Sequence, residues 1–191
     1  MSTFHRRSFA QQKERNEYMK KRIRKPGLCF LAVLCLIWLS GCGGVHQELG
    51  QESTAPDFTV KLSGGESFTL SDAQGKVVLL NFWATWCSPC VEEMPALEKI
   101  YQEYGEQIEV LAVDCGEEKA VVDRFLKEKD YSFPVAYDEN NEVSAKYPSD
   151  GIPYTLIIGK DGKVTETFTG SMGAEAQYKM YRRALKEAVA Q

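Results

Sequence analysis

Apolar and polar positions alternate in a way that divides residues 55–191 into a series of predicted strands and helices. Val77–Phe82 and Ile108–Val113 are apolar at almost every position, which is typical of strands buried on both faces. After the first of these strands, apolar residues return at helical spacing, as Met94, Leu97 and Ile100 do. The other predicted elements, in chain order, are strands Phe58–Val60 and Ser67–Leu70, helix 117–129, strand Phe133–Tyr137, helix Asn141–Tyr147, strands Tyr154–Ile158 and Lys163–Thr169, and helix Ala174–Ala190.

The order of these elements predicts an α/β fold, with a central mixed sheet flanked by helices. A strand–helix–strand crossover makes the central strands parallel. An N-terminal hairpin and a later hairpin add antiparallel strands, with Gly64-Gly65 and Asp161-Gly162 as their turns. The periodicity of helix 117–129 predicts that its core-facing residues are Val121, Val122, Phe125 and Leu126.

The beginning of the chain has a different pattern. A basic stretch, Lys20–Lys25, precedes the apolar run Leu28–Leu39, and Leu39-Ser40-Gly41-Cys42 follows. A lone transmembrane helix needs about 20 apolar residues, so this run of 12 suits the core of a signal peptide better. The last four residues resemble a bacterial lipobox, which implies that Cys42 is lipidated and becomes the mature N-terminus. A plain signal peptide or a short anchor helix is the alternative.

These observations predict three parts: a lipoprotein signal peptide at 1–41, a flexible tether at 42–54 and one folded domain at 55–191. A start at Met19 would give a signal peptide of ordinary length. The expected location is the extracytoplasmic face of the cell membrane, with the protein held there by its lipid.

Charge is distributed as unevenly as hydrophobicity. Nine of the 23 Lys and Arg residues and two of the 27 acidic residues precede residue 42, which leaves 14 basic and 25 acidic residues and a net charge of −11 for the remainder. Nucleic-acid binding needs a basic surface, so an acidic body argues against a nucleic-acid partner.

The six cysteines have different expected roles. Cys29 and Cys35 lie in the signal peptide, Cys115 has no evident partner, and Cys87 and Cys90 form a C-x-x-C pair. Two metal-binding uses of the pair are disfavoured. A structural zinc site needs about four ligands, more than this pair supplies, and a c-type haem site needs a His at the position that Val91 occupies. A structural disulfide across two residues would constrain the unfolded chain little. Redox exchange is therefore predicted, with no metal and no cofactor other than this pair.

The position of the pair suggests how it reacts. A cysteine at the start of a helix faces unpaired backbone N–H groups and the positive end of the helix dipole, and both lower the pKa of its thiol. We therefore expect Cys87 to attack and Cys90, one turn later, to resolve the mixed disulfide. Pro89 suits the first turn of a helix, where its missing N–H costs nothing.

The string Trp-Ala-Thr-Trp-Cys-Ser-Pro-Cys at 83–90, followed by Val-Glu-Glu-Met-Pro-Ala-Leu, resembles the thioredoxin superfamily. More narrowly, it is similar to the TlpA/ResA group of membrane-anchored thiol–disulfide oxidoreductases. The resemblance implies a thioredoxin-like fold, a helix kinked at Pro95, a cis peptide bond before Pro153 and an extra strand-and-helix insert at about 114–148. Thioredoxins carry a buried Asp where this chain has Asn81.

The resemblance also implies further site residues. Glu93 matches a glutamate that lies near the dithiol in ResA-like members, and a carboxyl group beside a buried thiol is suited to proton transfer with Cys90. The alternative is that Glu92 and Glu93 simply favour the helix N-terminus. The residues expected to contact substrate are Trp86, Ser88, Pro89, Ile152 and Pro153.

The leading hypothesis is a dithiol reductase that acts on disulfides of client proteins. The resemblance implies electrons from a CcdA/DsbD-like membrane protein, and clients such as apocytochrome c or oxidative-repair enzymes. A disulfide-introducing oxidase is the runner-up, because Ser88-Pro89 does not fix the direction of exchange. A thiol peroxidase is disfavoured by Ala84 at the threonine position of that motif, and a non-catalytic binding lipoprotein by the intact cysteines. We expect a monomer.

Overall fold

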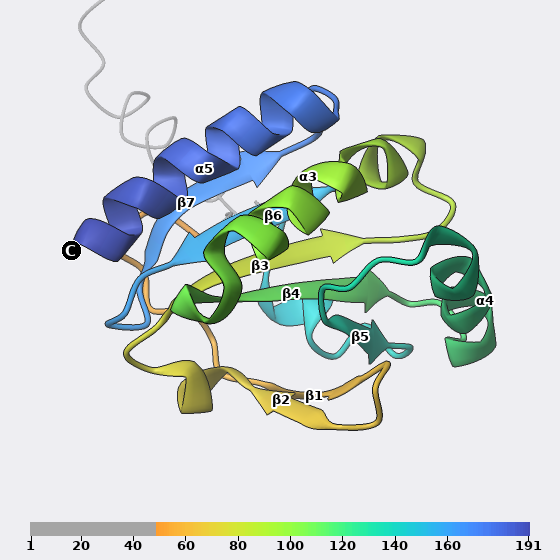
Figure 1. The fold of residues 1–191 in the computed structure, drawn as a ribbon. Helices are drawn as coiled ribbons and strands as arrows, with labels where there is room; N and C mark the ends of the chain where they lie inside the picture. The colour runs from red at the N-terminus through yellow and green to blue at the C-terminus, as the bar shows by residue number, and fades with distance from the viewer. Residues whose placement is uncertain (1–48) are drawn as a thin grey trace, which may run out of the picture. The chain divides into compact units, whose positions relative to one another are not determined.

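Seven strands form one mixed sheet in the order β2-β1-β5-β4-β3-β6-β7 (Figure 1). The computed structural model describes residues 49–191; the expected signal peptide, Cys42 and the first part of the expected tether lie outside the described residues. The strands are β1 (Thr59–Leu62), β2 (Ser67–Thr69), β3 (Val77–Trp83), β4 (Ile108–Cys115), β5 (Val135–Asp138), β6 (Tyr154–Ile158) and β7 (Val164–Thr169).

The centre of the sheet is parallel and its two sides are antiparallel. β3 pairs in parallel with β4, and β4 with β5. β6 and β7 continue the sheet beyond β3 in antiparallel orientation, and the β1–β2 hairpin pairs antiparallel with β5. The predicted α/β fold with a central mixed sheet is confirmed.

Both faces of the sheet are buried. The helices are α3 (Ser88–Tyr104), α4 (Lys119–Lys129) and α5 (Ala174–Ala190), and all three contribute to the core on one face (Figure 1). The other face is covered by the segments around Phe58, Leu70 and Tyr147. All seven residues of β3 are buried, as its continuous apolar run predicts for a central strand. The redox pair therefore follows a strand that is buried on both faces and paired with a neighbouring strand at each edge.

Two sequence expectations are wrong. The helix expected at 141–147 is only a 3₁₀ turn, Ser144–Lys146, because the Asp138 carboxylate accepts hydrogen bonds from the backbone N–H groups of Val143 and Ser144 and fixes a turn there. Val121, expected in the core, is 36% exposed, whereas Val122 is fully buried. Val121 lies at the side of the apolar stripe of α4, which Val122 and Phe125 occupy.

The ordered chain reaches further toward the N-terminus than residue 55. The Glu52 N–H donates to the Val164 carbonyl oxygen at 2.8 Å, and the Val164 N–H donates to the Ser53 carbonyl oxygen at 2.9 Å. Residues 52–54, expected as tether, thus lie along the start of β7. Within residues 49–191, none of the helices has the length and apolar character needed to cross a membrane.

Candidate active site

Cys87 and Cys90 form a disulfide at the junction between β3 and α3. Cys87 is the N-cap residue of α3, and its Sγ accepts a hydrogen bond from the Cys90 backbone N–H at 3.3 Å. The pair is nearly buried, with Cys87 5% and Cys90 1% exposed. Cys87 is thus the more accessible sulfur, and it lies at the helix N-terminus, where backbone N–H groups stabilise a thiolate.

The residues around the disulfide surface differ in exposure. Trp86, which precedes Cys87, is 69% exposed, so much of its indole is accessible at the surface. Ser88 and Pro89 are also exposed, on the first turn of α3. These three side chains are available to a second protein that approaches Cys87.

A loop before β6 lies against Cys87. The Cys87 Sγ is 3.7 Å from the carbonyl oxygen of Ile152, and the Ile152–Pro153 peptide bond is cis. Pro153 is buried and Ile152 half-buried. The Pro153 carbonyl oxygen accepts a hydrogen bond from the Gly170 N–H at 2.8 Å, which joins this loop to the segment after β7.

Glu93 is fully buried on α3, three residues after Cys90 and therefore on the same face of the helix. Its carboxyl group belongs to a closed ring of hydrogen bonds with side chains from three other elements. The Asn81 Nδ2 donates to Glu93 Oε1 and to Thr155 Oγ1, each at 2.8 Å. The Tyr181 hydroxyl lies 2.8 Å from Thr155 Oγ1 and donates to Glu93 Oε2 at 3.3 Å.

This environment makes Glu93 a weak acid. Burial raises the pKa of Glu93 to about 8, although hydrogen bonds from Asn81, Tyr181 and Ser171 act in the opposite direction. A carboxyl group with such a pKa is close to an unperturbed thiol in proton affinity. Such a carboxyl group can exchange a proton with a neighbouring thiol near neutral pH.

Several neighbours of the site carried no signal in the sequence. Tyr181 is part of the apolar stripe of α5, and it follows Glu93 by 88 residues. Ser171 and Met172 lie in the loop after β7; Ser171 hydrogen-bonds to Glu93, and Met172 is 73% exposed. The hydrogen bond from Gly170 to Pro153 joins this segment to the cis-proline loop, which contacts Cys87.

Cys115 is a half-buried free thiol, and Trp83 is a core residue. Burial, together with Asp114 and Asp138, raises the pKa of the Cys115 thiol to about 12, so it stays protonated at neutral pH. Trp83 is fully buried and packs against Phe125 with ring centroids 5.3 Å apart. Among residues 49–191, no three His, Cys, Asp or Glu side chains lie together in a way that could hold a metal ion.

Comparison with known proteins assigns the chain to a family. The model of the redoxin family matches residues 50–185. The chain belongs to the redoxin family. This redoxin is 35% identical over 167 residues to the thiol-disulfide oxidoreductase ResA of Bacillus cereus, and the match covers 80% of this chain and 94% of that protein.

Solved structures agree with this assignment. A crystal structure described as thiol:disulfide interchange protein DsbE from Chlorobium tepidum has a TM-score of 0.68 and 29% identity, covering 74% of this chain and 99% of its own. An exposed lipoprotein thioredoxin of Streptococcus pneumoniae has a TM-score of 0.62 and 33% identity, covering 69% and 99% respectively. The resemblance to the thioredoxin superfamily and its ResA-type members is confirmed. This redoxin is a thiol-disulfide oxidoreductase with Cys87 and Cys90 as its cysteine pair.

Proposed function

We propose that this redoxin is a reductase of client-protein disulfides, held by a lipid at the outer face of the cell membrane. The observation that carries the reaction is a fully buried carboxyl group, Glu93, one helical turn beyond the resolving cysteine. Its environment brings its proton affinity close to that of a thiol, as the resolving step requires.

The reaction begins with the Cys87 thiolate of the reduced protein. It attacks a client disulfide, so that a Cys87–client disulfide forms, the client S–S bond breaks and one client thiolate leaves. The Cys90 thiol then passes its proton to ionised Glu93 and attacks the Cys87 sulfur. This forms the Cys87–Cys90 disulfide and releases the second client thiolate, so two electrons have moved from the protein to the client.

The direction depends on how strongly the reduced pair is stabilised. Cys87 Sγ accepts a hydrogen bond from the Cys90 backbone N–H, and the ionisable side chain buried beside the pair, Glu93, supplies no positive charge that would stabilise a thiolate further. A moderately stabilised thiolate gives a reducing couple, whereas a strongly stabilised one gives an oxidant. We expect a reduction potential near that of thioredoxin, about −270 mV, in glutathione or dithiothreitol buffers. A value near −120 mV would instead support the disulfide-introducing oxidase.

The two cysteines have separate expected phenotypes. Cys87→Ser removes the attacking sulfur, so insulin disulfide reduction should fall to the uncatalysed rate. Cys90→Ser keeps the attack and removes the resolving thiol, so mixed disulfides should accumulate and appear on non-reducing gels. Full activity of the Cys87→Ser protein would contradict the mechanism.

Client contact is proposed at the exposed surface around Cys87. Trp86, Ser88 and Pro89 are exposed next to the cysteines in the chain, and the Ile152–Pro153 loop lies against Cys87. We add Met172, because large exposed apolar side chains are uncommon and often mark interaction surfaces. A client disulfide approaching Cys87 between these side chains would meet an apolar rim.

Membrane attachment is proposed through lipidation of Cys42, on the basis of the Leu-Ser-Gly-Cys string. The pneumococcal neighbour is itself described as an exposed lipoprotein, which supports this assignment. Cys42→Ala should abolish incorporation of labelled palmitate and move the protein from the membrane to the soluble fraction. Retention of Cys42→Ala in membranes would favour a short anchor helix.

The electron donor and client follow from this location. We propose a CcdA/DsbD-like membrane protein as donor, and apocytochrome c or an oxidative-repair enzyme as client. The Cys90→Ser protein, expressed in cells, should hold its client in a mixed disulfide. Mass spectrometry of that adduct distinguishes the two client classes.

A further inference from the structure

The turn that leads into the redox pair is bound by a side chain from another element. Thr85, two residues before Cys87, donates its backbone N–H to Glu117 Oε2 and its hydroxyl to Glu117 Oε1, both at 2.6 Å. One carboxylate thus accepts both donors of a single residue, and charge-assisted bonds of this kind are the stronger class of hydrogen bond. The contact fixes the Ala84–Trp86 turn between β3 and α3 against the segment between β4 and α4.

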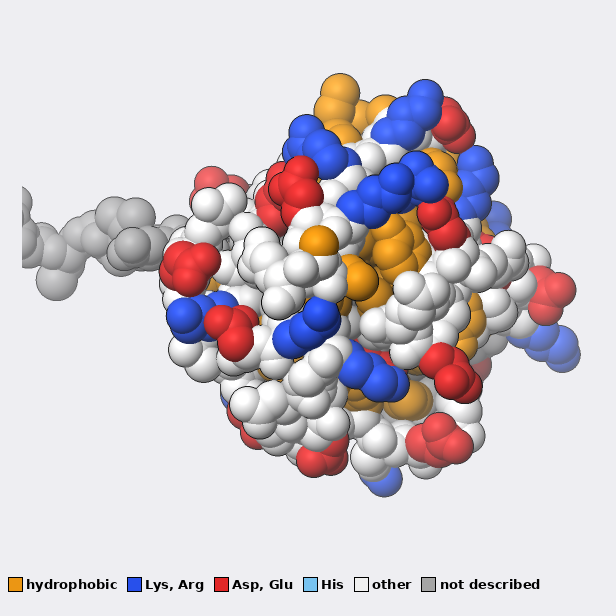
Figure 2. All heavy atoms as spheres, turned by 60° about the vertical axis from the view of Figure 1, so that its left-hand side comes forward, with side chains coloured by type: hydrophobic (Ala, Val, Ile, Leu, Met, Phe, Trp, Pro, Cys, Tyr) orange, Lys and Arg blue, Asp and Glu red, His pale blue; other side chains and the backbone are white. Residues whose placement is uncertain are grey.

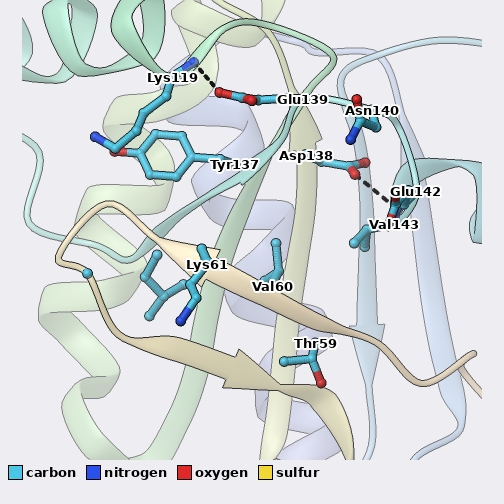
Figure 3. Close-up of a pocket in the computed structure, with 12 residues that line it drawn as sticks. Thr59, Val60, Lys61, Lys119, Tyr137, Asp138, Glu139, Asn140, Glu142 and Val143 are labelled. Atoms are coloured by element: carbon cyan, nitrogen blue, oxygen red, sulfur yellow. Dashed lines mark hydrogen bonds between the residues drawn. The ribbon is translucent and has the colours of Figure 1, made fainter.

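Glu117 is itself held firmly. Its backbone N–H donates to Asp114 Oδ1 at 3.2 Å, and the preceding Gly116 N–H donates to the Asp138 carbonyl oxygen at 3.1 Å. Two residues later, the Lys119 N–H donates to Glu139 Oε1 at 2.7 Å (Figure 3). A side chain supported on both sides in this way is preorganised to hold a neighbour.

Lys119 does not neutralise Glu117. Figure 3 shows the Lys119 side chain extended along the ring of Tyr137, and its Nζ lies 4.7 Å from the ring centroid. The same ammonium group pairs with Asp123 at 2.5 Å. The charge of Lys119 is therefore engaged within α4 and β5.

Asp114, at the end of β4, is the other acid next to Glu117. It is fully buried, and its Oδ2 has no hydrogen-bond partner among the described residues. Burial, with Glu117 close by, raises the pKa of Asp114 to about 8, so Asp114 is mainly protonated at neutral pH. Both Thr85 donors bond to Glu117, so a negative charge on that carboxylate is stabilised by two hydrogen bonds.

We propose that Glu117 is a positioning residue for the redox centre: it holds the Ala84–Trp86 turn through Thr85, and its charge makes the Cys87 thiol less acidic. This inference rests on the dithiol chemistry proposed above but not on the direction of exchange. It gives a role to the segment between β4 and α4, which contacts the turn before Cys87 through Glu117 and which the cysteine motif does not include.

The size of the effect follows from chain geometry. Two residues of extended chain span at most about 7 Å, so the Glu117 charge lies within roughly 10 Å of Cys87. At the effective dielectric of a protein surface, a unit charge at that separation shifts a thiol pKa by roughly half a unit to one unit. A shift of one unit is tenfold in the stability of the thiolate and corresponds to about 30 mV for a two-electron couple.

The charge is tested by Glu117→Gln, which keeps the shape of the side chain, with Glu118→Gln as its matched control. Glu118 is exposed, adjacent in sequence and makes no capping bond through its side chain. The full-length protein, purified in detergent and reduced, is alkylated with iodoacetamide across a pH series, and mass spectrometry reads modification of the Cys87 peptide. Glu117→Gln should lower the Cys87 pKa by roughly half a unit to one unit, and Glu118→Gln should leave it at the wild-type value.

The positioning role is tested at Thr85. Thr85→Val removes the hydroxyl donor without changing size or charge, and Thr85→Ser restores the hydroxyl. Thr85→Val should slow thiol–disulfide exchange with a small disulfide by roughly tenfold or more, the effect of losing one hydrogen bond to a charged group. Thr85→Ser should return the rate to near the wild-type value.

The outcomes separate cleanly. Equal Cys87 pKa values in Glu117→Gln, Glu118→Gln and the wild type would overturn the charge effect. A wild-type exchange rate in Thr85→Val would overturn the positioning role. If the wild-type protein failed to reduce insulin, the proposed function would fail, but the alkylation profiles would still decide the role of Glu117.

Discussion

A carboxyl group buried beside a dithiol couples the redox chemistry to pH. Glu93 is fully buried. Its carboxyl group lies in a network of hydrogen bonds with four side chains from separate parts of the chain: Asn81, Thr155, Ser171 and Tyr181. Their hydroxyl and amide groups stabilise the ionised form, and burial favours the neutral form by more. Glu93 is therefore mainly protonated near neutral pH, and its minor ionised form is the one that can accept the proton of Cys90.

The same group should make stability depend on pH. In the unfolded chain Glu93 loses its proton near its ordinary pKa of 4.5, whereas in the folded protein it keeps the proton until about pH 8. The folded state then binds more protons than the unfolded state between these values, so stability falls as pH rises by about 1.4 kcal/mol per unit. Glu93→Gln removes this pH dependence. As pH rises from 5 to 8, the free energy of unfolding of the Glu93→Gln protein should therefore increase relative to that of the wild type, by about a few kcal/mol.

Urea unfolding of both proteins at pH 5 and pH 8 measures this difference. Glu92→Gln is the matched control, since Glu92 is exposed on the same helix and bonds to Ser88 on the surface. If the free energy of unfolding changed equally between pH 5 and pH 8 in the Glu93→Gln and wild-type proteins, Glu93 would have the same pKa in the folded and the unfolded state, which would contradict this prediction.

At the scale of elements, the site is an assembly of one motif and three distant contributions. The start of α3 carries the cysteines, directly after β3, the loop before β6 brings Ile152 to 3.7 Å from Cys87, and α5 supplies Tyr181 to the Glu93 ring. The loop after β7 joins them, because Gly170 binds Pro153 and Ser171 binds Glu93. A client that contacts this loop would therefore approach the cis-proline loop and the disulfide together.

Met172 tests whether that loop contacts clients. It is 73% exposed, and Met172→Gln keeps its length while removing its apolar character. We expect the KM for a protein client such as insulin to rise by roughly threefold to tenfold, the effect of losing one apolar contact, with no change in the rate with a small disulfide. Val121→Gln, on the exposed apolar residue of α4, should leave both parameters unchanged. An unchanged KM in Met172→Gln would remove this loop from the client surface.

Elements with strong periodicity were predictable from the sequence, and elements with local competition were not. The buried run of β3 and the apolar stripes of α3 and α5 follow from spacing alone, because tertiary packing and local pattern agree there. The expected helix at 141–147 failed because Asp138 offers the backbone N–H groups of Val143 and Ser144 a closer acceptor.

For the candidate site, the sequence predicts the parts that a local motif encodes. Cys87, Cys90 and Glu93 lie within seven residues, so one motif and helical spacing bring them together. Tyr181, Ser171 and Glu117 reach the site only through the sheet order and the pairing of loops, which no local pattern specifies. Tyr181 also has the pattern of an ordinary core residue, and its hydroxyl becomes informative only once Glu93 lies opposite.

At the scale of the whole molecule, charge should influence which clients arrive fastest. From residue 42 onward the chain has 25 acidic and 14 basic residues, and on the face shown in Figure 2 Lys and Arg side chains lie among Asp and Glu. This excess of acidic over basic residues creates a negative potential that attracts positively charged partners. The potential acts over about a Debye length, which is roughly 10 Å at 0.1 M salt. Diffusional encounter with a basic client should be faster than with an acidic one.

Two peptides of equal length, each with one intramolecular disulfide and with net charges of opposite sign, measure this effect. At low salt the reduced protein should react with the basic peptide roughly tenfold faster than with the acidic peptide, because steering acts on the association step. In 0.5 M NaCl the two second-order rate constants should converge, since the potential is then screened within a few ångströms. A preference that persists undiminished in high salt would mean that discrimination lies in direct contacts at the rim of Trp86 and Met172, and not in the field of the whole domain.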